Sequence, residues 1–130
     1  MLRKTVKHEG GHPVILVDSI TKIEQGDGGA IIVSASHGGQ SSGEFALAVP
    51  LTAVFFNDAG IGKDEAGVAG LAMLDGRGVP ACAVSHESGR IGDAADMWEH
   101  GVISRVNDAA AKKGARAGMA VQEAVRTLAG

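Results

Sequence analysis

The sequence is poor in aromatic residues: it has no tyrosine, one tryptophan and three phenylalanines among 130 residues. Its core must therefore consist mainly of aliphatic side chains and alanine. Proteins that bind single-stranded nucleic acid usually stack the bases on aromatic side chains. The formal net charge of −3 also gives no basic excess for a phosphate backbone. The composition therefore argues against nucleic acid as a partner.

Cysteine is nearly absent, since Cys82 is the only one. No disulfide can form within the chain, which fits a reducing compartment. The basic residues near the N-terminus are not followed by a continuous apolar segment, so no secretory signal is expected. No stretch approaches the about 20 apolar residues of a membrane span. We therefore expect a cytoplasmic protein with no membrane partner.

Glycine is abundant, with 20 residues spread along the chain, about twice the usual share. This spacing indicates tight turns and close backbone approaches. The length predicts a single domain over residues 1–130. Its first 12 residues are expected to form a flexible or edge segment. There Gly10 and Gly11 lie between His8 and His12, so the two histidines cannot share a helix as metal ligands.

Short apolar runs alternate with helical patterns. The runs are continuous rather than alternating, which is typical of strands with both faces covered. We therefore predict an α/β fold: a small three-layer domain with a mostly parallel sheet of four or five strands and helices on both faces. The expected strands occupy residues 14–17, 30–34, 51–56, 79–84 and, less clearly, 101–106. The expected helices occupy residues 20–25, 44–49, 63–75, 93–99, 109–113 and 120–128.

Polar residues follow three of these strands at the point where each ends. They are Ser36-His37, Asn57-Asp58 and Ser85-His86. The carboxyl ends of parallel strands meet at one edge, which is where open α/β folds build their sites. Each loop contains glycine and leads to a carboxylate near an expected helix start. The first and third loops share Ser-His, five residues, glycine and a carboxylate, a match too short to prove an internal repeat.

This constellation predicts general acid–base chemistry. His37, His86 and Asp58 are the candidate catalytic residues: Asp58 orients one histidine, which then moves a proton. Backbone N–H groups of Gly38 and Gly39 would stabilise a developing oxyanion. The candidate ligand-binding residues are Ser36, Gly38, Gly39, Ser41, Ser42, Asn57, Gly60, Gly62, Ser85 and Glu87. In the alternative interpretation, the polar side chains cap helices or satisfy turns, and the histidines bridge loops.

Known motifs are missing from these loops. There is no Gly-x-Ser-x-Gly elbow, and Lys63 is followed by Asp64 rather than by the serine or threonine of a phosphate-binding loop. No spacing of histidines or cysteines indicates a metal, and no cofactor is predicted. Cys82 lies inside an expected strand, so it is a poor candidate for a nucleophile. Backbone N–H groups at helix starts nevertheless bind anions without any motif.

The residues are compatible with three hypotheses about function. The first is a small enzyme that acts on a small polar or anionic substrate by hydrolase- or lyase-like chemistry at the carboxyl edge of the sheet. The second is a non-catalytic module that binds an anion or small molecule, or an accessory subunit of a larger enzyme complex. The third is a structural domain that forms oligomers. The alanine-rich helices favour assembly with copies of the chain or with a partner subunit.

Overall fold

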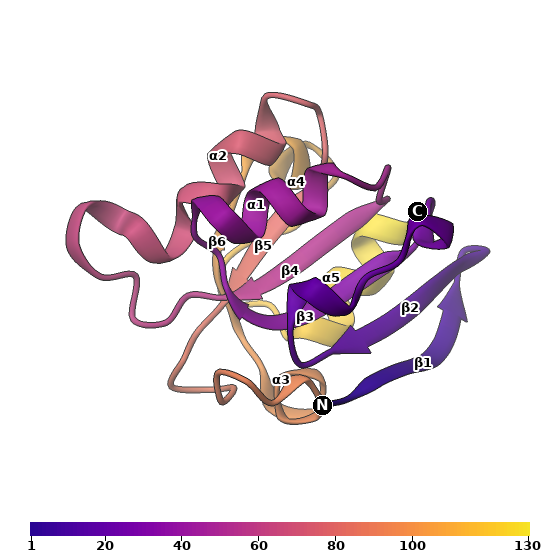
Figure 1. Cartoon of the computed structure of the whole chain (residues 1–130), viewed down its shortest axis with the longest axis horizontal. Coiled ribbons are helices and arrows are strands. Elements are labelled where there is room, and N and C mark those ends of the chain that lie inside the picture. The colour runs from indigo at the N-terminus through magenta and orange to yellow at the C-terminus, as the bar shows by residue number, and fades with distance from the viewer.

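The computed structural model describes all 130 residues and contains one six-stranded sheet with the strands in sequence order (Figure 1). Its four central strands are parallel, and the two outermost strands run antiparallel to their neighbours. The strands are β1 (Arg3–Glu9), β2 (His12–Val17), β3 (Ile31–His37), β4 (Ala53–Asn57), β5 (Ala81–Val84) and β6 (Ile103–Val106). The α/β class with a largely parallel sheet is thus confirmed, whereas the prediction of four or five strands was too low.

The extra strand is β1, which pairs with β2 in a hairpin. Gly10 and Gly11 make its turn at φ +57° and +84°, values that favour glycine. The strand signal is weak here because β1 is polar and partly exposed, with lysines at positions 4 and 7. Such residues are typical of an edge strand that must not pair with another chain. Of the two expectations for residues 1–12, the edge segment is the one observed.

Helices and short 3₁₀ turns connect the strands. The helices are α1 (Gln40–Leu47), α2 (Ala69–Asp75), α3 (Ala94–His100), α4 (Asp108–Lys112) and α5 (Val121–Ala129). The 3₁₀ turns are η1 (Ile20–Lys22), η2 (Gln25–Asp27) and η3 (Lys63–Val68). Two helices begin with a side-chain cap: Asp93 accepts a hydrogen bond from Asp96 N, and Asn107 accepts one from Ala110 N.

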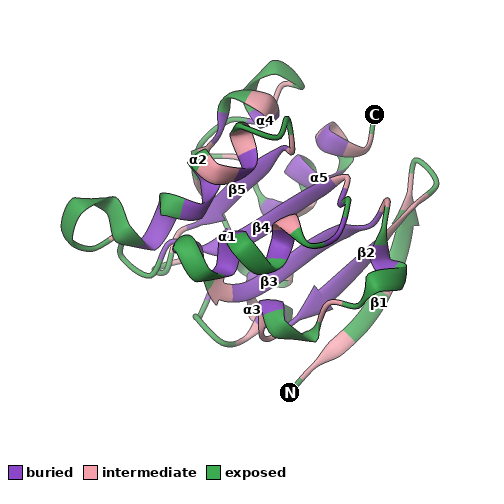
Figure 2. Ribbon diagram, turned by 45° about the horizontal axis from the view of Figure 1, so that its top comes forward, coloured by how far each residue is buried: buried purple, intermediate pink, exposed green.

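Two apolar clusters cover the two faces of the sheet, because successive strand residues point to opposite sides. Ile31 and Val33 belong to the cluster that includes residues of α3 and α5. Ile32 and Val54 belong to the cluster that includes residues of α1 and α2. Figure 2 shows the strands buried between these helices. The agreement with a three-layer domain is only rough, because beside β2 the second face is covered partly by Ile20 of the short turn η1.

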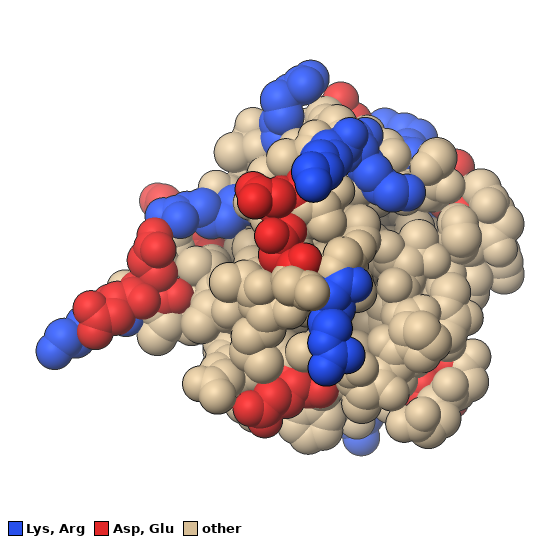
Figure 3. All heavy atoms as spheres, turned by 90° about the horizontal axis from the view of Figure 1, so that it is seen from above, with Lys and Arg blue, Asp and Glu red and all other residues tan.

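One segment departs strongly from the expected helix over residues 63–75. Only Ala69–Asp75 is α-helical, and Asp64 and Glu65 lie at φ +55° and +58°. Ala59 and Ile61 also have positive φ, which is unfavourable for residues with a side chain. We call residues 59–66 the arm, since they project from the body of the molecule with charged side chains at the tip (Figures 1 and 3). An exposed ion pair of 2.9 Å between Arg105 Nη1 and Glu65 Oε1 ties the arm to β6.

Candidate functional site

The sheet brings the three predicted loops together at the carboxyl edge of its parallel strands. In the strand register His37 lies opposite Asn57, and Asn57 lies opposite Val84, which precedes Ser85 and His86. The loop after β4 is therefore flanked by the two Ser-His loops. The prediction that these three strand ends are neighbours rests on the parallel order, which the structure shows.

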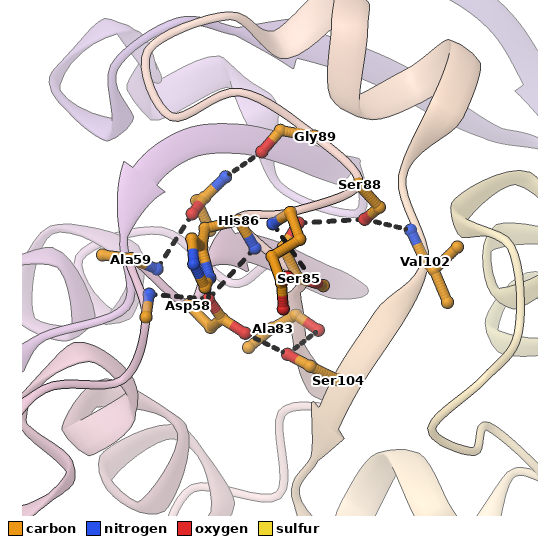
Figure 4. A network of polar contacts seen from close by, with 12 residues as sticks. Asp58, Ala59, Ala83, Ser85, His86, Ser88, Gly89, Val102 and Ser104 are labelled. Carbon is orange, nitrogen blue, oxygen red and sulfur yellow. Dashed lines mark hydrogen bonds and ion pairs between the residues drawn. The ribbon is translucent and has the colours of Figure 1, made fainter.

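Asp58 is the centre of this edge (Figure 4). Its side chain is only 6% exposed, yet its two oxygens accept four hydrogen bonds. Oδ1 accepts from Gly60 N at 2.8 Å, from His86 N at 3.1 Å and from His86 Nδ1 at 3.1 Å. Oδ2 accepts from Ser104 Oγ at 2.7 Å. Asp58 thus joins its own loop to the loop after β5 and to β6.

The pKa of Asp58 lies below its ordinary value. Burial by itself would raise this pKa, because it disfavours the charged carboxylate. The hydrogen bonds from Ser104 Oγ, from the backbone N–H groups of Gly60 and His86, and from the His86 side chain together outweigh burial. Asp58 is therefore a carboxylate at neutral pH and can only accept hydrogen bonds.

This charge assigns the tautomer of His86. Since the Asp58 carboxylate has no proton to give, His86 Nδ1–H must be the donor in the 3.1 Å contact. In the neutral ring Nε2 then carries a lone pair. The imidazole is 49% exposed, so one side of His86 is held by Asp58 while the ring remains accessible to solvent. This is the arrangement of an oriented general base.

His37 has the opposite tautomer. Gly39 N donates to His37 Nδ1 at 3.1 Å, so the proton of the neutral ring must be on Nε2. The side chain is exposed, and no hydrogen bond joins it to Asp58 or His86. A side chain at position 39 would lie 2.8 Å from the imidazole, so any residue other than glycine there would have to displace the His37 ring. The two predicted histidines thus present different groups, a base at His86 and an N–H donor at His37.

Gly38 and Gly39 do not offer free N–H groups for an oxyanion. Gly38 N donates to Asn57 O at 3.2 Å, and Gly39 N donates to His37 Nδ1. An oxyanion would therefore have to be stabilised by other donors than the N–H groups of Gly38 and Gly39. Gly38 instead allows a close backbone junction: a side chain there would lie 2.9 Å from Gly67 O, directly after the arm.

Several other predicted ligand residues have structural partners. Asn57 is fully buried, with its amide bonded to Gly89 O and Ala59 N. Ser36 Oγ accepts from Ile20 N at 2.9 Å, and Ser85 Oγ accepts from Glu87 N at 3.2 Å. These contacts agree with the alternative interpretation, in which the polar side chains form hydrogen bonds within turns rather than to a ligand. Of the remaining predicted residues, four are exposed and one is buried. Ser41, Gly60, Gly62 and Glu87 lie at the surface, whereas Ser42 is buried in α1.

Two contributors to this edge were missed in the sequence. Ser104, on β6, binds Asp58 directly, and Ser88 donates to Ser85 O and accepts from Val102 N. Ser104 alternates with the apolar Ile103 in an expected strand, but only the antiparallel return of β6 beside β5 brings it to Asp58. The one feature of the sequence that could have pointed to Ser104 was its position as a polar residue in an apolar edge strand.

The resemblance between the two Ser-His loops is not matched in the structure. After His37 the helix α1 begins at Gln40, and Glu44 is its fifth residue. After His86 the chain forms a longer turn, and Asp93 is the N-cap of α3. The two helices also belong to opposite apolar clusters, since Ala46 of α1 and Met97 of α3 pack on different faces. The matching residues therefore occupy different structural positions.

The residues of the structure give little support to a cysteine nucleophile or to a metal site. Cys82 is fully buried, and burial raises the pKa of its thiol to about 12, so it is not a thiolate at neutral pH. No three side chains among histidine, cysteine, aspartate and glutamate are placed to hold a metal ion together. None of the helices is both long and apolar enough to cross a lipid bilayer.

The surface hollows lie elsewhere. The most voluminous, of about 380 Å³, lies beside Asp75 and Lys112, and none of the four contains His37, Asp58 or His86 in its lining.

Comparisons with family models, with curated proteins and with solved structures found no match to this chain. Inference about its chemistry therefore rests on the geometry of the carboxyl edge.

Proposed function

We propose that the protein is a small enzyme that moves a proton on a small polar or anionic substrate, by hydrolase- or lyase-like chemistry, at the carboxyl edge of its sheet. The observation that carries the proposal is the Asp58–His86 pair. A buried carboxylate holds Nδ1–H of a half-exposed imidazole, which leaves Nε2 free to accept a proton. The reducing cytoplasm expected from the single cysteine is part of this proposal.

In this mechanism His86 is the catalytic base and Asp58 is a positioning residue. When Nε2 takes a proton from the substrate or from an attacking water, the Asp58 carboxylate stabilises the imidazolium that forms. His37 lies on β3, two strand spacings or about 10 Å across β4 from β5. Its Nε2–H is available as a donor to the substrate or to a leaving oxygen.

The first test is thermal unfolding in the presence of small carboxylates, inorganic phosphate, nucleotides and divalent cations. A ligand at 100 times its dissociation constant adds about 2.7 kcal/mol, which is a shift of several degrees in a domain of this size. The shift should disappear in a His37→Ala/His86→Ala variant. A stabilising ligand that binds this variant equally well would place its site elsewhere.

The second test measures turnover of any stabilising ligand in D₂O by proton NMR, which detects both cleavage and exchange of carbon-bound protons. A general base contributes about 10²- to 10⁴-fold to the rate, so His86→Gln should lower turnover by this factor. Asp58→Asn should lower it less. The control is His100→Gln, an exposed histidine at the end of α3. Equal turnover by His86→Gln and the control would contradict the proposed chemistry.

One observation favours the second candidate function, a binding module or accessory subunit. The Asp58–His86 pair lies at an open edge, outside all four surface hollows. A second chain, either a copy or a different subunit, would then enclose the site. Light scattering over a range of concentrations tests for self-assembly. Ligand stabilisation without turnover in the isolated chain would support this function over the enzyme.

A further inference from the structure

We infer that the outer face of α1 is a dimer interface, whose partner is a second copy of this chain. Three features of this surface carry the inference: an exposed aromatic side chain, two neighbouring hollows and two opposite charges that have no partner in the molecule. The residues that form this surface, which we call the α1 face, are Glu44, Phe45, Leu47, Ala48, Arg77 and Val79. None of His37, Asp58 and His86 belongs to the α1 face, so its role goes beyond the proposed function.

Phe45 is an aromatic side chain on the outward side of α1. It is 45% exposed, whereas Phe55 and Phe56 are fully buried in the sheet. Four large hydrophobic side chains of the chain are exposed, and Phe45 is the one aromatic among them. The helix lies on the outside of the molecule, with its exposed residues in green (Figure 2). A second chain that covers Phe45 would therefore remove apolar surface from water, which favours association.

Two hollows lie beside each other on the α1 face. One has a volume of about 240 Å³ and is lined by Glu44, Phe45 and Ala48. The other has a volume of about 300 Å³, and its lining includes Leu47, Ala48 and Val79. Ala48 lines both hollows, so it lies between them. The α1 face is thus divided at Ala48 into a side that carries Phe45 and a side with an apolar hollow that can receive an aromatic ring.

The two sides of the α1 face carry opposite charges. Glu44 lies on the side of Phe45, and Arg77 lines the hollow on the other side. Both side chains are exposed, and neither forms an ion pair within the chain. A partner that matches this face must offer a cation opposite Glu44 and an anion opposite Arg77. A second copy of the chain supplies both.

A two-fold axis at Ala48 brings these features together. In a two-fold dimer both copies use the same surface, so each contact occurs twice. An axis that lies in the interface at Ala48 places the Phe45 side of each copy against the Val79 side of the other. Phe45 of one copy then enters the hollow beside Val79 of the other, and Glu44 of one copy faces Arg77 of the other. The shape and the charge of the α1 face are therefore both self-complementary.

The test measures the molar mass of the full chain by sedimentation equilibrium from about 1 μM to 1 mM, the range of weak association. We expect an equilibrium between monomer and dimer. Phe45→Ser should weaken dimerisation at least about tenfold, because buried aromatic anchors carry much of the binding energy of an interface. The control is Ile91→Ser, since Ile91 is 48% exposed in the turn before α3, outside the α1 face. This control should dimerise like the wild type.

Two results of this measurement would overturn the inference. A chain that stays monomeric over the whole range would show that a second copy does not cover the α1 face, and a different protein would have to be its partner. Equal dimerisation by Phe45→Ser and Ile91→Ser would show that the chain dimerises through another surface.

A pair of charge reversals tests the two-fold arrangement. Glu44→Arg or Arg77→Glu alone places like charges opposite each other at two points of the dimer, so each variant should weaken dimerisation several-fold. The double variant restores opposite charges and should dimerise like the wild type. A double variant that dimerises no better than either single one would contradict the pairing of Glu44 with Arg77, and with it the α1 face as the interface. Turnover and its loss in His86→Gln are measured independently of this result.

Discussion

Asp58 depends on a hydroxyl that comes from a distant part of the sequence. Ser104 Oγ donates to Asp58 Oδ2 at 2.7 Å, and this is the first of the contacts that lower the pKa of the carboxyl against the effect of burial. In Ser104→Ala the pKa of Asp58 should rise toward its ordinary value, with a loss of about 1.5–3 kcal/mol of stability at neutral pH. A carbon-13 NMR titration of the Asp58 carboxyl measures the pKa, and urea unfolding measures the stability.

The matched control for this prediction is Ser88→Ala. Ser88 makes two hydrogen bonds within the neighbouring turn, to Ser85 O and from Val102 N, and none to Asp58. We expect this variant to lose stability while leaving the pKa of Asp58 unchanged. An equal shift of the Asp58 pKa in both variants would mean that the loop as a whole, rather than the Ser104 hydroxyl, sets the charge of the carboxylate.

At the scale of residues, the sequence allowed part of this edge to be predicted. Strand ends identify Asp58 and His86 as neighbours, because parallel order alone brings them together. Asn57 was predicted as a ligand, yet strand alternation points its side chain to the same face as Phe55, where it is fully buried and donates to Gly89 O. Ser104 was missed because its position depends on β6 returning antiparallel, which its four residues do not reveal.

The arm is attached through glycine positions at its C-terminal end. A side chain at Gly67 would collide with Asp58 O and would lie 2.8 Å from Ile61 O. Gly67→Ala should therefore displace the backbone that carries Asp58, with a loss of about 1–3 kcal/mol, as for overpacking in a core. The measurement is the midpoint of urea unfolding.

Gly26→Ala is the matched control, because a side chain there meets no atom within 4 Å and Gly26 does not have positive φ. Its stability should differ from that of the wild type by less than about 0.5 kcal/mol, as for other surface substitutions. If Gly67→Ala proved equally harmless, the junction between the arm and Asp58 would be looser than the contacts indicate.

At the scale of elements, local sequence predicted most helices but failed at the arm and at residues 20–25, where short 3₁₀ turns replace the expected helix. The helices expected over residues 93–99 and 109–113 are observed as Ala94–His100 and Asp108–Lys112, within one residue at each end. In contrast, Lys63 to Asp75 has a helical pattern, but its first part has positive φ at Asp64 and Glu65. The close packing of Gly67 against Asp58 and of Gly70 against Gly39 determines this backbone. Such contacts join residues whose proximity no local pattern expresses.

An ion pair links the edge strand β1 to the turn η2. Arg3 donates to both oxygens of Asp27, at 2.8 and 2.9 Å, and Asp27 is 7% exposed. The Arg3 hydrogen bonds lower the pKa of Asp27 below its ordinary value, although burial alone would raise it. The pKa of Asp58 is lowered as well.

These two lowered pKa values predict acid sensitivity. A carboxyl whose pKa is lower in the folded state stabilises the fold above its unfolded pKa of about 4, and this contribution is lost as the pH falls through the folded pKa. We expect the stability to decline below about pH 4. Asp27→Asn should be less stable at neutral pH and should show a flatter decline, as measured by thermal unfolding from neutral to acidic pH.

The control for acid sensitivity is Asp64→Asn. Asp64 lies exposed on the arm and makes no hydrogen bond through its side chain, so its replacement should leave the pH profile unchanged. If the stability of Asp27→Asn falls with pH in parallel with that of Asp64→Asn and of the wild type, the prediction is contradicted. Such a result would show that the Arg3–Asp27 ion pair does not couple protonation to folding.

At the scale of the whole molecule, the parallel centre of the sheet was predictable, whereas the edge strand β1 and the antiparallel direction of the other edge strand, β6, were not. Continuous apolar runs identify β2 to β5 because both of their faces are buried. The edge strand β1 is polar and partly exposed, so the same criterion overlooks it. Its pairing depends on the Gly10-Gly11 turn, and its anchoring depends on Arg3 reaching Asp27 across the chain.

The central claim is that Asp58 holds His86 with its proton on Nδ1, which leaves Nε2 as a base. Long-range proton–nitrogen NMR of the imidazole rings measures which nitrogen of the neutral ring carries the proton. We predict the Nδ1–H form for His86, the Nε2–H form for His37, and loss of the His86 preference in Asp58→Asn. An Nε2–H form of His86 in the wild type would contradict the account, because its exposed nitrogen would then have no lone pair with which to accept a proton.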